Sequence, residues 1–548
     1  MTWIDYTIVF VFLFGIFYAG SYFYKWVDTP DDFYVAGRQI TPFLLAATIA
    51  ATNVNLYSFV GQAGVAYKHG ISILWQTWTG NMALVFSGLF VIPILRRLKV
   101  RTVPEYLELR YNKGVRTLVG VLWIFRLAFW LGVVLYTAVV AAQAITGVQS
   151  FTLWVIVFSV IAIIYTSLGG MWSVALTDAL QFILMLFGAL ILLPIAMKAV
   201  GWMPGLLAKT PPHHLDLVVK NGPYNWQFML AILILGIEWA SVDQGLMQRA
   251  FGARDTKTVA KGLVLAGIIT TPFALLWNLP GLAATVLYPN LANPDSAVPT
   301  MIHGLLPPII LGIVVCGLLA SQMSTIDSNL NGVATLYTND IYGSLFNRKA
   351  GQKQILSTVR WMTLITGIFM IGFSYLVPML GGAVSAYLTV IAIMDMPLFI
   401  IAIFYGLLWK RASSLGAIGG YLIGALAGGI AKFGYAMDFN NATFISAGAA
   451  LVATPVFSWL TEPVNAEKIS KIWAARKISQ EEIDKKAIYH IWPESLWGKF
   501  SLLILFAGLL LFLAGALMGS RSLPLASTVA VSGMLIYFLG GFVRLFFD

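Results

Sequence analysis

Long apolar stretches alternate with short polar connections along the whole chain. Each stretch has enough apolar residues to cross a membrane as a helix, which takes roughly 20 residues. The alternating pattern of transmembrane β-strands does not appear. We therefore predict an all-α polytopic membrane protein with about 15 spans, at residues 4–24, 42–66, 72–95, 117–146, 150–168, 174–198, 226–247, 262–288, 305–338, 357–378, 382–409, 414–433, 442–461, 499–519 and 523–546.

Composition supports this class. The chain has 548 residues, of which 59% are hydrophobic and 10% charged, whereas soluble domains carry about 25% charged residues. With the N-terminus outside, 27 of the 34 Lys and Arg residues fall on the cytoplasmic side, as the positive-inside rule requires. The net charge of +11 is therefore a topology signal rather than a sign of nucleic-acid binding. We expect a multi-pass plasma (inner) membrane protein in contact with lipid, with a cytoplasmic C-terminus, no nucleic-acid partner and the monomer as functional unit.

Charged residues inside the predicted spans are few and mostly acidic. A charge at the centre of a bilayer costs about 2.5 kcal/mol or more. Such carboxylates imply protonation, water or a bound cation, although Asp243 can pair with Arg249 or Arg126. The five acids are Asp178, Glu238, Asp243, Asp327 and Asp395, and the one comparably deep base is Arg126.

Two polar segments at similar depth suggest a cation site. Residues 51–59 (ATNVNLYSF) interrupt the second span, and residues 318–332 (LLASQMSTIDSNLNG) place hydroxyls and a carboxylate along one helix face. Both lie roughly 18–21 Å from the inner ends of their spans. Oxygen ligands suit small hard cations, and an unwound helix at 51–59 offers free carbonyls. The alternative interpretation of the hydroxyl-rich segment is a Ser/Thr-rich contact between helices.

At these segments the chain resembles the solute:sodium symporter family, which contains the sodium/glucose cotransporters. The motifs include FYVAGRQ (33–39), TVPEYLELRYN (102–112), SLGGMWSVALTDALQ (167–181), DQGLMQRAFGARD (243–255), STIDSNLNGVATLYTNDIY (324–342) and GLLWKR (406–411). The resemblance implies an inverted-repeat, leucine-transporter-like core of 5+5 helices. The expected division is 1–41, an extra helix and inner loop; 42–198 and 226–409, the two repeats; and 410–548, accessory helices. Polar interruptions at 52–58 and 238–244, in the first helix of each half, mark the expected binding site.

The resemblance also implies sodium ligands. The shared sodium site maps onto backbone oxygens of Ala51, Val54 and Ser321 and side-chain oxygens of Ser324 and Thr325. A candidate second sodium or proton site maps onto Asp178, Asp327 and Ser328, together with Ser324.

The substrate site does not carry over from the family's sugar carriers, because Ser58, Thr77, Gly80, Gly236 and Thr270 stand at the corresponding positions. Hydroxyl-accepting groups and tryptophan faces nearby favour a sugar or cyclitol, and would equally suit an organic cation. An organic acid is disfavoured, since Arg126 is its only obvious partner. The candidate substrate residues are Asn55, Ser58, Gln76, Thr77, Glu238, Trp239 and Asp395.

These features predict sodium-coupled symport of a small polar solute by alternating access, not enzymatic activity. The histidines are scattered near span ends and in loops, and form no recognisable catalytic cluster. Alternatives are a symporter of an organic cation or amino acid, a sodium-gated channel or a solute sensor.

Overall fold

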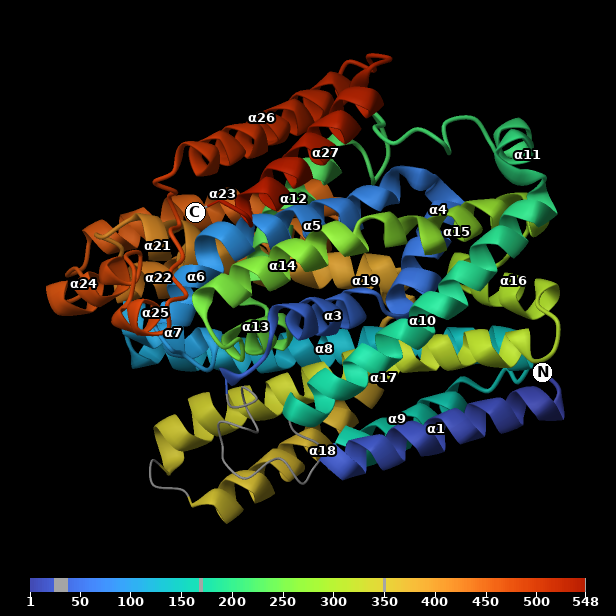
Figure 1. Ribbon diagram of the computed structural model, residues 1–548, viewed down its shortest axis with the longest axis horizontal. Coiled ribbons are helices and arrows are strands. Elements are labelled where there is room, and N and C mark those ends of the chain that lie inside the picture. The colour runs from blue at the N-terminus through green and yellow to red at the C-terminus, as the bar shows by residue number, and fades with distance from the viewer. Residues whose placement is uncertain (24–37, 167–170, 348–350, 548) are drawn as a thin grey trace.

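The protein is a bundle of long helices that run roughly parallel to one another (Figure 1). The computed structural model describes residues 1–23, 38–166, 171–347 and 351–547. Within these ranges, eleven helices are long and apolar enough to cross a membrane, or up to thirteen when each of two bent pairs is taken as one span. Two shorter apolar helices, Trp3–Gly15 and Phe151–Ile163, coincide with the first and fifth predicted spans. Within the described residues, each predicted span thus falls on helical segments.

We call each run of consecutive helical segments a rod. The rods of the first half are α1 (Trp3–Phe23); α3 (Pro42–Asn53) with η3 (Ser58–Gln62) and α4 (Ala63–His69); η4 (Ile71–Ile73) with α5 (Leu74–Phe86), η5 (Ser87–Val91) and α6 (Ile92–Arg97); α8 (Lys113–Thr146); α9 (Phe151–Thr166); and α10 (Met171–Val200). The rods that follow are α12 (Trp226–Val242) with α13 (Gln244–Phe251); α14 (Thr256–Thr270) with η6 (Pro272–Ala274) and α15 (Leu275–Leu287); α17 (Ile310–Thr335) with η8 (Leu336–Phe346); α18 (Gln352–Leu376); α19 (Ala383–Val390) with η10 (Ile391–Asp395), α20 (Met396–Phe399), η11 (Ile400–Phe404) and α21 (Tyr405–Leu408); α22 (Ser414–Gly429) with η12 (Ile430–Gly434); α23 (Phe439–Trp459); α26 (Leu496–Gly519); and α27 (Ala526–Arg544). The shorter helices between them are α7 (Val103–Arg110), α11 (Trp202–Lys209), η7 (Pro294–Ser296), α16 (Ala297–Leu305), η9 (Pro378–Leu380), α24 (Ala466–Ala474) and α25 (Gln480–Asp484).

The rod that begins with α3 is broken where the sequence is polar. α3 and the helix that follows it meet at an angle of 48°. The local sequence favours the break, because β-branched and Asn residues are poor helix formers. Val54 is extended, and the Asn55 side-chain amide donates to the carbonyl of Thr52, so side-chain bonding replaces part of the helical ladder.

The rod formed by α12 and α13 is broken at Asp243, also with a bend of 48°. Asp243 has an extended conformation, and its Oδ1 accepts from the backbone N–H of Leu246 at 3.1 Å. The carboxylate therefore caps the start of α13 and satisfies a donor that a helix start leaves unpaired.

Glycines allow the C-terminal helices to pack closely. A Cβ built at Gly508 or Gly515 of α26, or at Gly533 or Gly540 of α27, would overlap the backbone of the facing helix. Since apolar area alone does not drive association in lipid, such close backbone contact stabilises helix pairs there. α26 and α27 lie side by side along one edge of the bundle (Figure 1).

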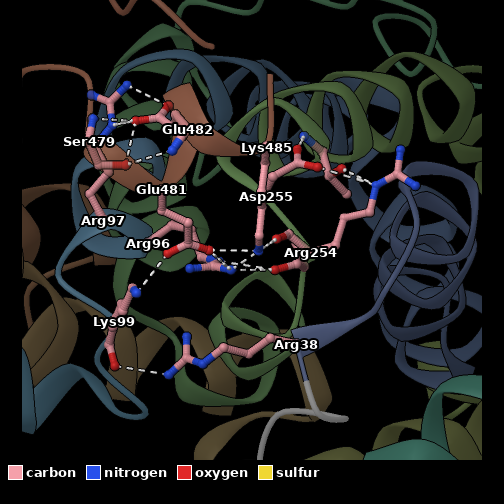
Figure 2. Close-up of polar contacts among 12 residues, drawn as sticks. Arg38, Arg96, Arg97, Lys99, Arg254, Asp255, Ser479, Glu481, Glu482 and Lys485 are labelled. Carbon is pink, nitrogen blue, oxygen red and sulfur yellow. Dashed lines mark hydrogen bonds and ion pairs between the residues drawn. The ribbon is translucent and has the colours of Figure 1, made fainter. Parts of the chain in front are cut away.

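The connection 462–498, between α23 and α26, docks on the protein. Its helices α24 and α25 lie at the end of the bundle that carries α6, α7 and the C-terminus, opposite the N-terminus (Figure 1). We call this end of the bundle, which carries α6, α7, α24, α25 and the C-terminus, the basic face. Here Glu482 of α25 binds Arg97, and Glu481 binds Lys99 at 2.8 Å (Figure 2). The connection is therefore held by ion pairs to the ends of distant spans.

Candidate functional site

A cavity of about 130 Å³ lies between the two helix breaks. A protein cavity of about 150 Å³ holds a molecule the size of benzene, so the space suits a small solute. Its wall is built from the α3 break, η3, α5, α8, α12, α17 and the α19–η10 rod. The two interruptions seen in the sequence thus border one chamber.

The end of α3 supplies carbonyl oxygens to this region. The last helical bond of α3 runs from the N–H of Val54 to the carbonyl of Ala50. The carbonyls from Ala51 onward lie beyond the helical ladder, as the last carbonyls of any helix do. Ala51 and Val54, the two predicted backbone ligands on this helix, are both buried.

α17 packs against α3 and supplies the predicted hydroxyl ligands. Ser321, Ser324 and Thr325 are buried, and Thr325 lines the cavity together with Thr52 of α3. The Ser324 hydroxyl has no hydrogen-bond partner within the described part of the chain. A buried oxygen without a hydrogen-bond partner, on a helix that packs against α3, has the chemistry that a small hard cation requires.

Asp327 and Ser328, two of the candidates for a second cation site, are not among the residues that line this cavity. Asp327 lines a separate, largely apolar space of about 310 Å³ between α1, α8, α9 and α17. The Ser328 hydroxyl donates to the carbonyl of Ser324 at 2.6 Å and accepts from Arg249. The side chain of Asp178 lies outside the described residues.

Most of the predicted substrate residues line the cavity. Gln76 donates to the Tyr57 hydroxyl at 2.9 Å, and its own carbonyl oxygen has no partner among the described residues. Glu238 is the exception, since it is fully buried and is not part of the cavity wall. The residues that do line the cavity are Asn55, Ser58, Gln76, Thr77, Trp239 and Asp395.

Arg126 of α8 is held by two carboxylates at the cavity wall. Its Nη2 lies 2.6 Å from Asp395 Oδ2, and its Nη1 lies 3.0 Å from Asp243 Oδ2. Of the two bases considered for Asp243, Arg126 is therefore the partner. Arg249 instead donates to Thr48 of α3 at 2.8 Å.

The structure adds cavity residues that the sequence did not single out. Tyr57, Trp130 and Tyr387 form an aromatic group whose ring centroids are 4.8–5.5 Å apart. Gln62 accepts from Thr77 at 2.9 Å and from the indole of Trp277. Gln62 could have been identified from the sequence, because it is a polar residue inside a predicted span. Nothing in the sequence distinguishes the three aromatic residues from residues that only pack in the core.

Two tryptophans near the predicted substrate residues bond to backbone outside the substrate site. The indole of Trp75 donates to the carbonyl of Leu217, and that of Trp78 donates to the carbonyl of Thr271. Trp239 lines the cavity. It faces Gly80, and a side chain at position 80 would extend toward its ring.

α13 contributes Gly245 and Leu246 to the cavity wall. Arg249 links α13 to Thr48 of α3 and to Ser328 of α17, and Gln248 donates to Thr335 of α17 at 3.0 Å. The broken segment is thus fixed to both helices that carry the predicted sodium ligands.

The chain is similar in sequence to known transporters. The sequence pattern of the sodium:solute symporter family matches residues 33–424. A sodium/glucose cotransporter of Vibrio parahaemolyticus is 27% identical over 423 residues, covering 71% of this chain and 77% of that protein. A sodium/pantothenate symporter of Haemophilus influenzae is 28% identical over 429 residues, covering 72% and 83%.

Solved structures show the same fold. A Na⁺-coupled sialic acid symporter in a substrate-bound, outward-open state has a TM-score of 0.75 at 21% identity, covering 85% of this chain and 99% of that one. Mhp1, a nucleobase-cation-symport-1 family transporter, in a closed conformation has a TM-score of 0.55 at 15% identity, covering 82% and 99%. The predicted leucine-transporter-like fold is confirmed.

These relatives are transporters rather than enzymes, and sodium is the expected coupling ion. The chain belongs to the sodium:solute symporter family, and is a multi-pass membrane protein that couples sodium to the symport of a small solute.

Proposed function

We propose that the solute is a small, neutral, polyhydroxylated molecule, a sugar or cyclitol. The observation that carries this proposal is the chemistry of the cavity wall: amides and hydroxyls of Asn55, Gln76 and Thr77 beside aromatic faces, with Arg126 already neutralised by Asp243 and Asp395. Amide and hydroxyl groups pair with sugar hydroxyls, and aromatic rings cover the apolar faces of such a solute.

An organic cation is the second candidate. Two aspartates face one arginine at the wall, and Trp130 and Trp239 offer ring faces. A cation can be stabilised by both features. A direct uptake screen separates the two classes, because a neutral polyol and a quaternary amine differ in charge at similar size.

We propose that one sodium ion binds between the carbonyls of Ala51, Val54 and Ser321 and the hydroxyls of Ser324 and Thr325. Binding there fastens the end of α3 to α17 and so stabilises the conformation that receives solute. Each ligand then raises the affinity of the other by the same factor. Inward movement of one charge across 100 mV adds about 2.3 kcal/mol.

The architecture that serves this cycle is proposed as two repeats, residues 42–198 and 226–409, flanked by residues 1–41 and 410–548. The equal 48° bends in the first rod of each half support it. We place the basic face in the cytoplasm and the protein in the plasma membrane. The cavity is built within one chain, which supports a monomer as the functional unit.

The test is uptake into proteoliposomes of radiolabelled glucose, myo-inositol, choline and proline, with and without an inward sodium gradient. We expect sodium-dependent uptake of glucose or myo-inositol. Sodium-dependent uptake confined to choline would replace the first candidate by the second. Uptake indifferent to sodium, or currents of channel size, would overturn the coupled mechanism.

The sodium ligands are tested without a solute, by the rise in melting temperature that sodium produces. A ligand stabilises the folded state by RT ln(1 + [L]/Kd). We expect sodium to raise the melting temperature of the wild type and of Thr363→Ala, but not of a Ser324→Ala/Thr325→Ala variant. Thr363 is the matched control, since its buried hydroxyl bonds to the carbonyl of Val359 on α18. An unchanged sodium response in the double variant would contradict the assignment.

A further inference from the structure

An excess of buried acidic groups surrounds Arg126. Asp243, Asp395 and Glu238 are 5%, 1% and 0% exposed, and Arg126 is 3% exposed. The guanidinium is bonded to both aspartates. If all four groups were ionised, one positive charge would face three negative charges at membrane depth. Arg126 can balance only one of these three negative charges, and the acidic group that it does not bond has no counter-charge.

Glu238 is that group. Both of its carboxylate oxygens are buried and have no hydrogen-bond partner within the described part of the chain. The charged groups that act on it are Arg126, Asp243 and Asp395. An ionised carboxylate buried without partners is far more costly than a neutral one.

The elements packed against α12 offer Glu238 no other base. α5, α20 and α23 contain no ionisable residue, Lys499 of α26 is exposed, and Arg249 of α13 is bonded to Thr48. Two tyrosines interact with it, Tyr387 and Tyr421, and the buried Tyr421 hydroxyl has no partner among the described residues.

A proton suits this position better than a metal ion. Within the described residues, no three acidic, histidine or cysteine side chains converge as ligands for a metal. A metal ion needs several oxygens around it, whereas a proton needs a single carboxylate oxygen.

We propose that Glu238 is a proton-binding site, occupied in the conformation described here. Release follows from the geometry of Arg126. Asp243 lies at the break between α12 and α13, so a movement of α13 that separates it from Arg126 frees a guanidinium N–H and removes one nearby negative charge. Both changes favour ionised Glu238, whose O–H bond then breaks and gives its proton to a water molecule that the movement admits beside it. The link to the transport cycle rests on the proposed function; the protonated state in this conformation does not.

Infrared spectroscopy of the full chain in lipid vesicles tests the site directly. At neutral pH we expect the carbonyl stretching band of a protonated carboxylic acid, shifted by labelling with ¹³C-carboxyl glutamate. Glu238→Gln should lose this band and Glu494→Gln should keep it, because the Glu494 side chain is 83% exposed. A wild-type spectrum without a glutamic acid band overturns the proposal even if Glu238→Gln fails to fold, and so does a band that survives Glu238→Gln.

The release step has its own variant. Asp243→Asn removes one counter-charge of Arg126, and we expect the glutamic acid band to weaken or disappear at the same pH. A band of full intensity in this variant would overturn the proposed route of release. Neither measurement depends on sodium-driven uptake, so failure of this proposal and failure of the proposed function are distinguishable.

Discussion

The ion pair between Arg97 and Glu482 gives the sharpest prediction. Arg97 ends α6, and its Nε and Nη2 donate to the two carboxylate oxygens of Glu482 at 2.8 and 2.9 Å. The side chains are 2% and 3% exposed. Glu482 also accepts from the N–H and hydroxyl of Ser479 (Figure 2). Arg97 donates in addition to the carbonyl of Tyr489 at 2.6 Å.

Replacing Glu482 by Gln keeps the shape of the side chain and leaves Arg97 as a buried charge without its counter-ion. Removing one partner of a buried pair costs about 3–5 kcal/mol. Because α25 belongs to a short docked segment, the loss should appear as local opening of residues 466–491 rather than as global unfolding. At about 1.4 kcal/mol per factor of ten, the opening equilibrium should rise by roughly two to three and a half orders of magnitude.

Hydrogen exchange measured by mass spectrometry on the protein in lipid nanodiscs checks this. Peptides from residues 466–491 should lose protection in Glu482→Gln, while peptides from α8 should not change. Glu467→Gln is the control in the same segment, because Glu467 pairs with Lys471 and both side chains are largely exposed, at 70% and 67%. Such exposed pairs contribute little, so protection should stay near the wild-type value.

A double replacement separates pairing from packing. In Arg97→Met/Glu482→Leu neither charge remains, and protection should recover at least part of what Glu482→Gln loses, since apolar residues often substitute well for a buried pair. Wild-type exchange in Glu482→Gln, or equal losses in Glu482→Gln and Glu467→Gln, would refute the reasoning.

Two further predictions concern the opposite face and the lipid-exposed edge. Burial raises the pKa of Asp295 on η7 to about 6, despite a hydrogen bond from the N–H of Ala383. Between pH 3.8 and about 6 the folded state therefore holds more protons than the unfolded state, and stability should fall as the pH rises through this window. In Asp295→Asn the melting temperature should depend less on pH over the same range. An unchanged pH dependence in this variant would contradict the argument. Gly533→Leu should separate α27 from α26 and lower the melting temperature, because a side chain at this position meets the backbone near Phe512. Gly448 faces open space, so Gly448→Leu should leave the melting temperature unchanged. Equal effects of the two substitutions on the melting temperature would argue against close packing of α26 and α27.

Much of the architecture could be predicted from the sequence. In a membrane each backbone polar group must be satisfied within the span, so apolar length alone indicates a helix, and each predicted span lies on one. The polar interruptions at 52–58 and 238–244 also correspond to real breaks. These features are local, and local chemistry decides them.

The sequence identified charges whose partners it could not assign. Arg126 is separated from Asp243 and Asp395 by more than a hundred residues of chain, and spacing along one helix says nothing of which other helices face it. The same holds for Asp327, which is on the face of α17 that borders a different space from Thr325.

The sequence by itself therefore determined that this is a polytopic helical protein with two discontinuous helices and polar groups at mid-membrane. Only the tertiary structure decided that Arg126 pairs with two aspartates, that Glu238 is left without a bonded counter-charge, and that residues 466–491 dock on the basic face. The physical reason is that electrostatic energy in a low-dielectric interior depends on distances between helices, and those distances follow from packing of side chains far apart in the chain.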